Sequence, residues 1–236
     1  MKKSIQLMRA ENFLLKHDSL FNISLVFPTL LTILINSYFY YRGLTFYESL
    51  RYFTEVYFMC LPLFVSLSVS FSMKGEEAID YQYLLSNVFS KKKKLVTKSV
   101  AIIIKLFISA LISIIPLFLL NVILGELQIM VYLVLLLSIL LSISAYVQIF
   151  LFSTIYLNST ATIMFGGLSL LITAIASMII GNYLFLAIPW VWGTSLVGLL
   201  LQGANFKSLA ILIVLCTGVC LFLTYISITL IEKKEC

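Results

Sequence analysis

The chain contains few charged residues, and long stretches of it contain none. Only 11% of the 236 residues are charged, against roughly 25% in an ordinary soluble domain, and none lies between Glu126 and Lys207. Because 61% of the residues are hydrophobic, a soluble core could not hide so much apolar surface, and lipid must be the solvent for most of it. No Asp, Glu, Arg or His falls near the middle of a long apolar run, which argues against an ion-driven transporter.

The residues needed for most enzyme chemistry are also missing. The single histidine, His17, cannot form a Ser/His/Asp set or a pair of metal ligands, and there is no phosphate-binding loop of the GxxxxGK[ST] kind. The four cysteines lack CxxC spacing; Cys216 and Cys220 lie one helical turn apart in an apolar run, which predicts packing residues. We therefore predict a chain that is not an enzyme, does not hydrolyse nucleotide by itself and holds no metal or cofactor.

What the sequence does contain is a series of apolar runs, each long enough to cross about 30 Å of hydrocarbon as a helix. The runs are continuously apolar, which excludes barrel strands. The predicted fold is therefore an all-α integral membrane protein, with residues 1–236 forming one domain. The six predicted spans are Leu20–Tyr41, Thr54–Met73, Ser99–Leu124, Ile129–Leu157, Ala161–Ile180 and Ser208–Ile231.

The distribution of Lys and Arg predicts the orientation. If the N-terminus is cytosolic, 13 of the 16 Lys and Arg residues fall on the cytosolic side, and only Arg42, Arg51 and Lys207 fall outside. The chain is therefore expected to be a multi-pass protein of the cell membrane, with both termini in the cytosol. The net charge of +6 surrounds membrane segments and predicts no nucleic-acid partner.

The first 19 residues are predicted to form an amphipathic helix along the inner membrane surface. Over Ile5–Ser19, the apolar Ile5, Met8 and Leu15 share one face, while Arg9, Glu11 and Lys16 lie elsewhere. The alternative is a frayed basic tail.

Residues 181–207 are too apolar for a plain outer loop. Two short arms around Pro189 and Gly193 fit a re-entrant or interfacial helical hairpin between spans five and six. Trp190 and Trp192 would then lie at the outer headgroup level and anchor the hairpin.

The fourth and fifth spans carry small and mildly polar residues. A short turn at Asn158–Thr160 makes these spans antiparallel neighbours, and glycines such as Gly166 let helices approach closely. Close packing is one interpretation of this pattern. The alternative is the wall of a translocation path that includes Ser142 and Gln148.

The segment 74–98 is the one long charged stretch, and it is predicted to be cytosolic. An apolar stripe on a short helix over Ala78–Phe89 is formed by Tyr81, Leu84, Leu85, Val88 and Phe89. Acids precede this helix and a lysine cluster follows it, as the helix dipole favours. One interpretation is a helix resting on lipid; the other is a docking helix for a soluble partner. The cluster of Lys91, Lys92, Lys93 and Lys94 is expected to anchor the segment to anionic headgroups.

The overall pattern resembles the permeases of type-2 ABC exporters, which also have six spans, an amphipathic lead and an outer hairpin before the last span. The run Glu76-Glu77-x4-Gln82-x-Leu84-Leu85, followed by the lysine-rich approach to span three, is similar to the lantibiotic-immunity permease subunits of Gram-positive bacteria. Relatives often have a glycine where Ile79 or Asp80 stands. The resemblance implies that this segment is the coupling helix that contacts the ATPase, through Glu76, Glu77, Gln82, Leu84 and Leu85, with Tyr81 and Phe89 from the apolar stripe.

The function implied is the membrane subunit of an ATP-driven exporter that expels an amphiphilic peptide and so confers bacteriocin resistance. Its partners would be a cytosolic ABC ATPase that carries ATP and Mg, and a second permease that is identical or related. Two alternatives stay open. One is a type-2 exporter for a drug, lipid or ion, and the other is a scaffold or sensor subunit that transports nothing.

Overall fold

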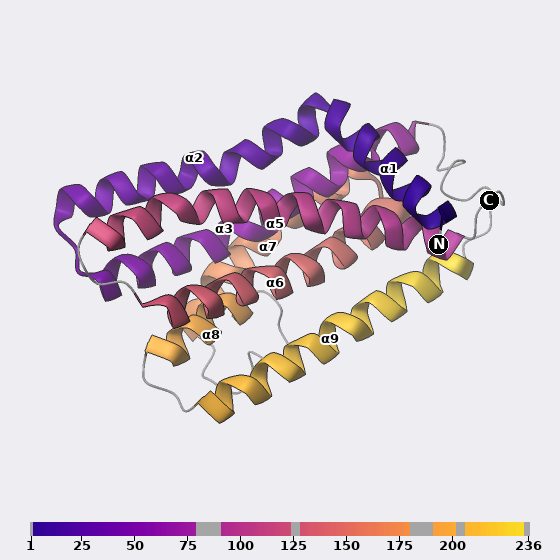
Figure 1. Cartoon of the computed structure of the whole chain (residues 1–236). Helices are drawn as coiled ribbons and strands as arrows, with labels where there is room; N and C mark the ends of the chain where they lie inside the picture. Colours follow the sequence, from indigo (N-terminus) through magenta and orange to yellow (C-terminus); the bar gives the residue numbers. More distant parts are fainter. Residues whose placement is uncertain (1, 79–90, 124–127, 180–190, 202–205, 234–236) are drawn as a thin grey trace.

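Eight α-helices make up the part of the chain that the computed structural model describes, which is residues 2–78, 91–123, 128–179, 191–201 and 206–233 (Figure 1). These residues contain no strand, so the predicted all-α fold class is confirmed. The helices are α1 (Lys2–His17), α2 (Ser19–Arg42), α3 (Phe46–Glu77), α5 (Lys91–Ile123), α6 (Ile129–Tyr156), α7 (Ser159–Ile179), α8 (Trp192–Leu201) and α9 (Phe206–Lys233).

Five of these helices are long and apolar enough to cross a membrane. Their qualifying stretches are Ser24–Arg42, Tyr47–Glu77, Lys92–Ile123, Ile129–Tyr156 and Ala210–Ser227. They run side by side along one bundle axis, and the start of α1 and the end of α9 (Phe206–Lys233) lie at the same end of the bundle (Figure 1). We refer to this end as the terminal end. Helix α7 is apolar as well, and it lies where the fifth predicted span was expected.

Helix α3 extends beyond its predicted span of Thr54–Met73 at both ends. It begins at Phe46 because Thr45 accepts a hydrogen bond from the backbone N–H of Glu48, whose side chain accepts one from the backbone N–H of Thr45 in return. The preceding turn reverses at Gly43, which has a φ of 63°, a conformation that glycine adopts without strain. Hydropathy marks the part of a helix that lies in lipid, whereas caps determine where the helix starts.

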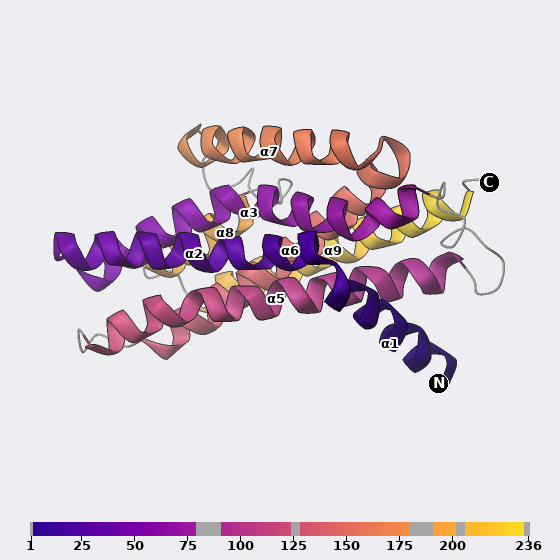
Figure 2. The same cartoon turned by 90° about the horizontal axis from the view of Figure 1, so that it is seen from above.

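Helix α6 is the centre of the bundle, and α3, α5, α7, α8 and α9 all pack against it. Helix α7, the fifth predicted span, packs on α6, the fourth span, as expected. Its main neighbour, however, is α3, the second predicted span. Figure 2 shows α7 running beside α3 on the side of the bundle opposite α5. The approach is close, because a Cβ built on Gly166 would lie 1.8 Å from Ser66 Oγ. The predicted role of small residues in close packing is confirmed at this position.

The N-terminal segment is helical from Lys2 to His17, which confirms that the predicted lead is a helix; its place along the inner membrane surface stays a prediction. Asp18 then caps α2 by accepting a hydrogen bond from the backbone N–H of Phe21, and α1 turns away from the axis of α2 at this point (Figure 2). The prediction that Glu11 lies away from the apolar face is wrong. Glu11 follows Leu7 by one turn and precedes Leu15 by one turn, and all three side chains are buried against the bundle.

The second arm of the predicted outer hairpin is the ten-residue helix α8, which packs on α6, α3 and α9. Trp192 at its start is 0% exposed and lies in a small core with Leu141, Cys216 and Cys220. This placement corrects the expectation that Trp192 faces headgroups, because its ring is enclosed by protein. It also confirms the two cysteines as packing residues. Trp190 and the first arm lie outside the described residues.

Candidate functional site

Helix α3 ends and α5 begins at the terminal end of the bundle (Figure 1), so both stems of the predicted coupling segment lie there. Its two stems are described: Glu76 and Glu77 form the last turn of α3, and the lysine cluster forms the first turn of α5. The residues between the stems lie outside the described part of the chain, so the proposed contacts of that portion with an ATPase remain predictions. The predicted residues concerned are Tyr81, Gln82, Leu84, Leu85 and Phe89.

A buried ion pair ties the two stems together. Lys98 Nζ on α5 donates to Glu76 Oε1 on α3 across 3.0 Å, and the two side chains are only 3% and 9% exposed. Two charges removed from water need such a partner, because an isolated buried charge is far more costly than a paired one. The family resemblance implied that Glu76 contacts a partner, whereas its carboxylate turns inward, toward α5.

The lysine cluster divides into exposed and buried members. Lys92 and Lys93 are exposed, as headgroup anchoring requires, whereas Lys94 is 0% exposed. The side chain of Lys91 lies outside the described part of the chain. The buried Lys94 corrects the expectation that all four lysines meet lipid, since its ammonium group is enclosed by protein.

Glu77 joins the same stem to a third helix. The backbone N–H of Ser159, the first residue of α7, donates to both carboxylate oxygens of Glu77 at 3.2 and 3.3 Å. Two further bonds link the helices here, because the hydroxyls of Ser70 and Ser159 donate to each other's backbone carbonyls. A carboxylate at a helix N-terminus is stabilised by unpaired N–H groups and by the helix dipole. The last turn of α3 is therefore connected to both α5 and α7.

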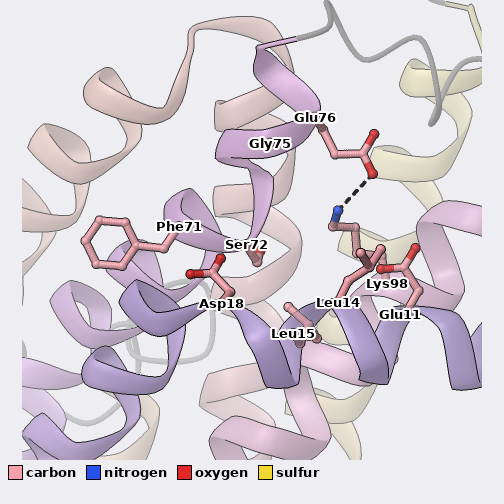
Figure 3. A pocket seen from close by; sticks show the side chains of 9 residues that line it. All are labelled: Glu11, Leu14, Leu15, Asp18, Phe71, Ser72, Gly75, Glu76 and Lys98. Carbon is pink, nitrogen blue, oxygen red and sulfur yellow. Dashed lines mark hydrogen bonds and ion pairs between the residues drawn. The ribbon is translucent and has the colours of Figure 1, made fainter.

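A cavity of about 470 Å³ lies beside this ion pair and is lined by residues of α1, α3 and α5; α1 itself packs on α5. Figure 3 shows the carboxyl groups of Glu11 and Glu76 both turned toward the Lys98 side chain. The remaining lining residues, mostly apolar, are Leu14, Leu15, Asp18, Phe71, Ser72 and Gly75.

Glu11 is a further candidate residue at this site, and it was not among those selected from the sequence. Its side chain is 1% exposed, and neither carboxylate oxygen has a hydrogen-bond partner among the residues described. Burial raises the pKa of Glu11 above its ordinary value of 4.5, the charge of Lys98 acts in the opposite direction, and the charge of Glu76 adds to the rise. The available signal was the spacing of Leu7, Glu11 and Leu15, which places the acid on the apolar stripe.

The two residues predicted for a translocation path, Ser142 and Gln148, are both buried in α6. The Ser142 hydroxyl oxygen has no hydrogen-bond partner within the described structure, and neither residue lines the cavity beside Glu11. In this conformation they are packing residues of the central helix. A path along them would require the helices around α6 to separate.

Comparison with known proteins returned no relative. No protein-family model matches the chain, and no curated protein or solved structure matches it either. Functional inference therefore depends on the residues themselves and on the geometry of the terminal end.

Proposed function

We propose that this chain is the transmembrane permease subunit of an ATP-driven ABC exporter that moves an amphiphilic peptide from the membrane to the outside, as in lantibiotic immunity. The observation that carries the proposal is the connection of the two stems of segment 79–90. The buried Glu76–Lys98 pair joins α3 to α5, and Glu77 joins α3 to α7. A force applied to that segment would therefore act on three helices together.

In the proposed mechanism, a separate cytosolic ATPase binds the helix predicted over Ala78–Phe89. ATP and Mg on that subunit supply the energy, since the chain has no phosphate-binding loop of its own. Closure of the ATPases would push the coupling helix and tilt α3, α5 and α7 against α6, which changes access between the inner leaflet and the exterior. Six spans with both termini inside, and a second permease beside this one, complete the proposed assembly.

The coupling role is tested by co-purification with the ATPase encoded nearest to this chain. Leu84→Asp and Leu85→Asp place a charge on the apolar stripe, and we expect each to abolish capture of the ATPase. Ser86→Asp is the matched control, because it adds the same charge on the opposite face of the predicted helix and should leave capture intact. Parent-level capture by both leucine variants would refute the docking role and favour a scaffold or sensor.

The substrate class needs a separate assay. Cells that lack the subunit are compared with cells that carry it for sensitivity to a panel of lantibiotics, drugs and detergents. We expect increased sensitivity to an amphiphilic peptide, restored by the parent chain and not by Leu84→Asp. A change confined to a drug would assign the exporter to that substrate class, and no change to any peptide would refute the immunity role.

A further inference from the structure

The cavity between α1, α3 and α5 is lined by more carboxylates than ammonium groups. Glu11, Asp18 and Glu76 face a single cation, Lys98, which is already paired with Glu76 Oε1. Asp18 already accepts a hydrogen bond from the backbone N–H of Phe21. Both oxygens of Glu11 and Oε2 of Glu76 have no hydrogen-bond partner in the described part of the chain. Buried carboxylate oxygens in proteins are nearly always hydrogen-bonded, so this site is short of donors.

The rest of the lining suits a hydrocarbon stem. Leu14, Leu15 and Phe71 supply apolar surface, and Leu14 is 55% exposed. A volume of about 470 Å³ falls within the roughly 300–1,000 Å³ of small-molecule pockets. The cavity therefore combines an acidic end with an apolar wall.

We propose that this cavity binds an amphiphilic primary ammonium compound, whose –NH₃⁺ group donates to Glu11 and Glu76 while its alkyl stem lies against Leu14, Leu15 and Phe71. Three N–H donors match the three carboxylate oxygens that lack partners. The bound cation would also hold α1 against α3, since its ligands come from these two helices. The proposal does not depend on an ATPase or on transport.

Other ligand classes fit less well. Among the described residues no group of three His, Cys, Asp or Glu side chains is arranged to hold a metal ion. An anion would meet the carboxylates of Glu11 and Asp18, and the Lys98 ammonium group is already occupied by Glu76. The second cation near Glu76 is Lys94 on α5, which is buried and does not line the cavity.

The pH dependence of binding follows from the same residues. The groups that face Glu11 are Lys98 on α5 and Glu76 on α3, with Asp18 at the start of α2 lining the same cavity. Without a ligand, burial keeps the pKa of Glu11 raised, so a cation must displace the proton before it binds the carboxylate. Affinity should therefore increase as pH rises through the pKa of Glu11.

The test measures binding of n-octylammonium by titration calorimetry to the full chain in phosphatidylcholine nanodiscs, which contain no primary amine. We expect saturable binding to the parent chain. The Glu11→Gln substitution should weaken this binding at least tenfold and abolish its pH dependence. Glu55→Gln, which changes an exposed acid near the start of α3, is the control and should bind as the parent does. Equal binding of n-octanol, or equal affinity of the Glu11→Gln variant, would overturn the proposal.

A cavity-filling variant provides an independent measurement if Glu11→Gln does not fold. Gly75 lines the cavity, and a Cβ placed there meets nothing within 4 Å, so Gly75→Leu can occupy the space without a backbone clash. The Gly75→Leu substitution should abolish binding. The control Gly167→Leu, at an equally open position on α7, should leave binding intact. Binding retained by Gly75→Leu would contradict the proposed site. Nanodiscs containing phosphatidylethanolamine then identify the source, since competition assigns the occupant to a lipid headgroup and its absence to a free amine.

Discussion

At the scale of single residues, charge burial distinguishes the terminal end of this molecule. Lys98 and Glu76 form an ion pair that is almost fully enclosed, whereas Arg51 and Glu55 near the start of α3 form one whose side chains are 72% and 45% exposed. Exposed pairs contribute little because water screens them. An enclosed pair is different, because removal of one partner leaves the other charge buried without compensation.

We predict that Lys98→Met destabilises the chain by about 3–5 kcal/mol, with Lys94 offsetting part of the loss because it also lies near Glu76. The measurement is unfolding in detergent, followed by circular dichroism. The double variant Glu76→Gln/Lys98→Met should recover most of the stability, since no charge is then left alone. Arg51→Met is the matched control and should change little. Equal destabilisation by Lys98→Met and Arg51→Met would contradict the importance of burial.

Glu11 gives a prediction about pH. Its pKa in the folded chain is raised above the ordinary value of 4.5, so the folded state binds this proton more tightly than the unfolded state does. The stability that this proton contributes is complete below about pH 4.5 and is lost as pH rises through the raised pKa of the folded state. In buffer without amines, the melting temperature of the parent minus that of Glu11→Gln should fall across this window. A difference that is constant with pH would show that Glu11 titrates normally.

Local patterns could predict part of this site and not the rest. The acids and lysines of segment 74–98 are visible as a charged stretch, but their partners are not. Glu76 meets Lys98, which is 22 positions away, and Glu77 meets Ser159, which is 82 positions away. Such contacts depend on which helices become neighbours. The burial of Glu11 is a similar case, since α1 acquires its inner face only by packing on α5.

At the scale of helices, small residues determine how closely α7 approaches α3. A Cβ on Gly166 would overlap Ser66, at 1.8 Å from Oγ and 2.4 Å from Cβ. The neighbouring Gly167 faces open space, where a Cβ meets nothing within 4 Å. Sequence patterning predicted close packing at Gly166, but it paired α7 with α6. The dominant α3 contact depends on the matching small side chain of Ser66.

We therefore predict that Gly166→Ala lowers stability by about 1–3 kcal/mol, the usual cost of overpacking. Gly167→Ala should be neutral or slightly stabilising, because alanine is the better helix former. The compensating pair Ser66→Gly/Gly166→Ala restores the missing space and should recover the lost stability. Thermal unfolding of the four proteins in one detergent decides the matter, and equal melting temperatures for the two alanine variants would refute close packing.

At the scale of the whole molecule, the helical class of the fold was predictable from the long apolar runs, whereas six spanning helices stay a prediction. A backbone in hydrocarbon must satisfy its own hydrogen bonds, so long apolar runs become helices. The five helices long enough to span agree in position with five of the six predicted runs. Helix ends were less predictable, as α3 shows, because capping at Thr45 and the turn at Gly43 act outside the apolar region.

The arrangement also predicts which ends of the bundle face each compartment. The α2–α3 turn lies at the end opposite the termini (Figure 1), and the excess of Lys and Arg predicts that the termini are cytosolic. In a chain whose four native cysteines are replaced by serine, we expect Arg42→Cys to react with a membrane-impermeant maleimide in intact cells. Lys92→Cys, which is exposed at the start of α5, should react only after the membrane is permeabilised. Labelling of Lys92→Cys in intact cells, with protection of Arg42→Cys, would invert the orientation and place segment 79–90 out of reach of any cytosolic ATPase.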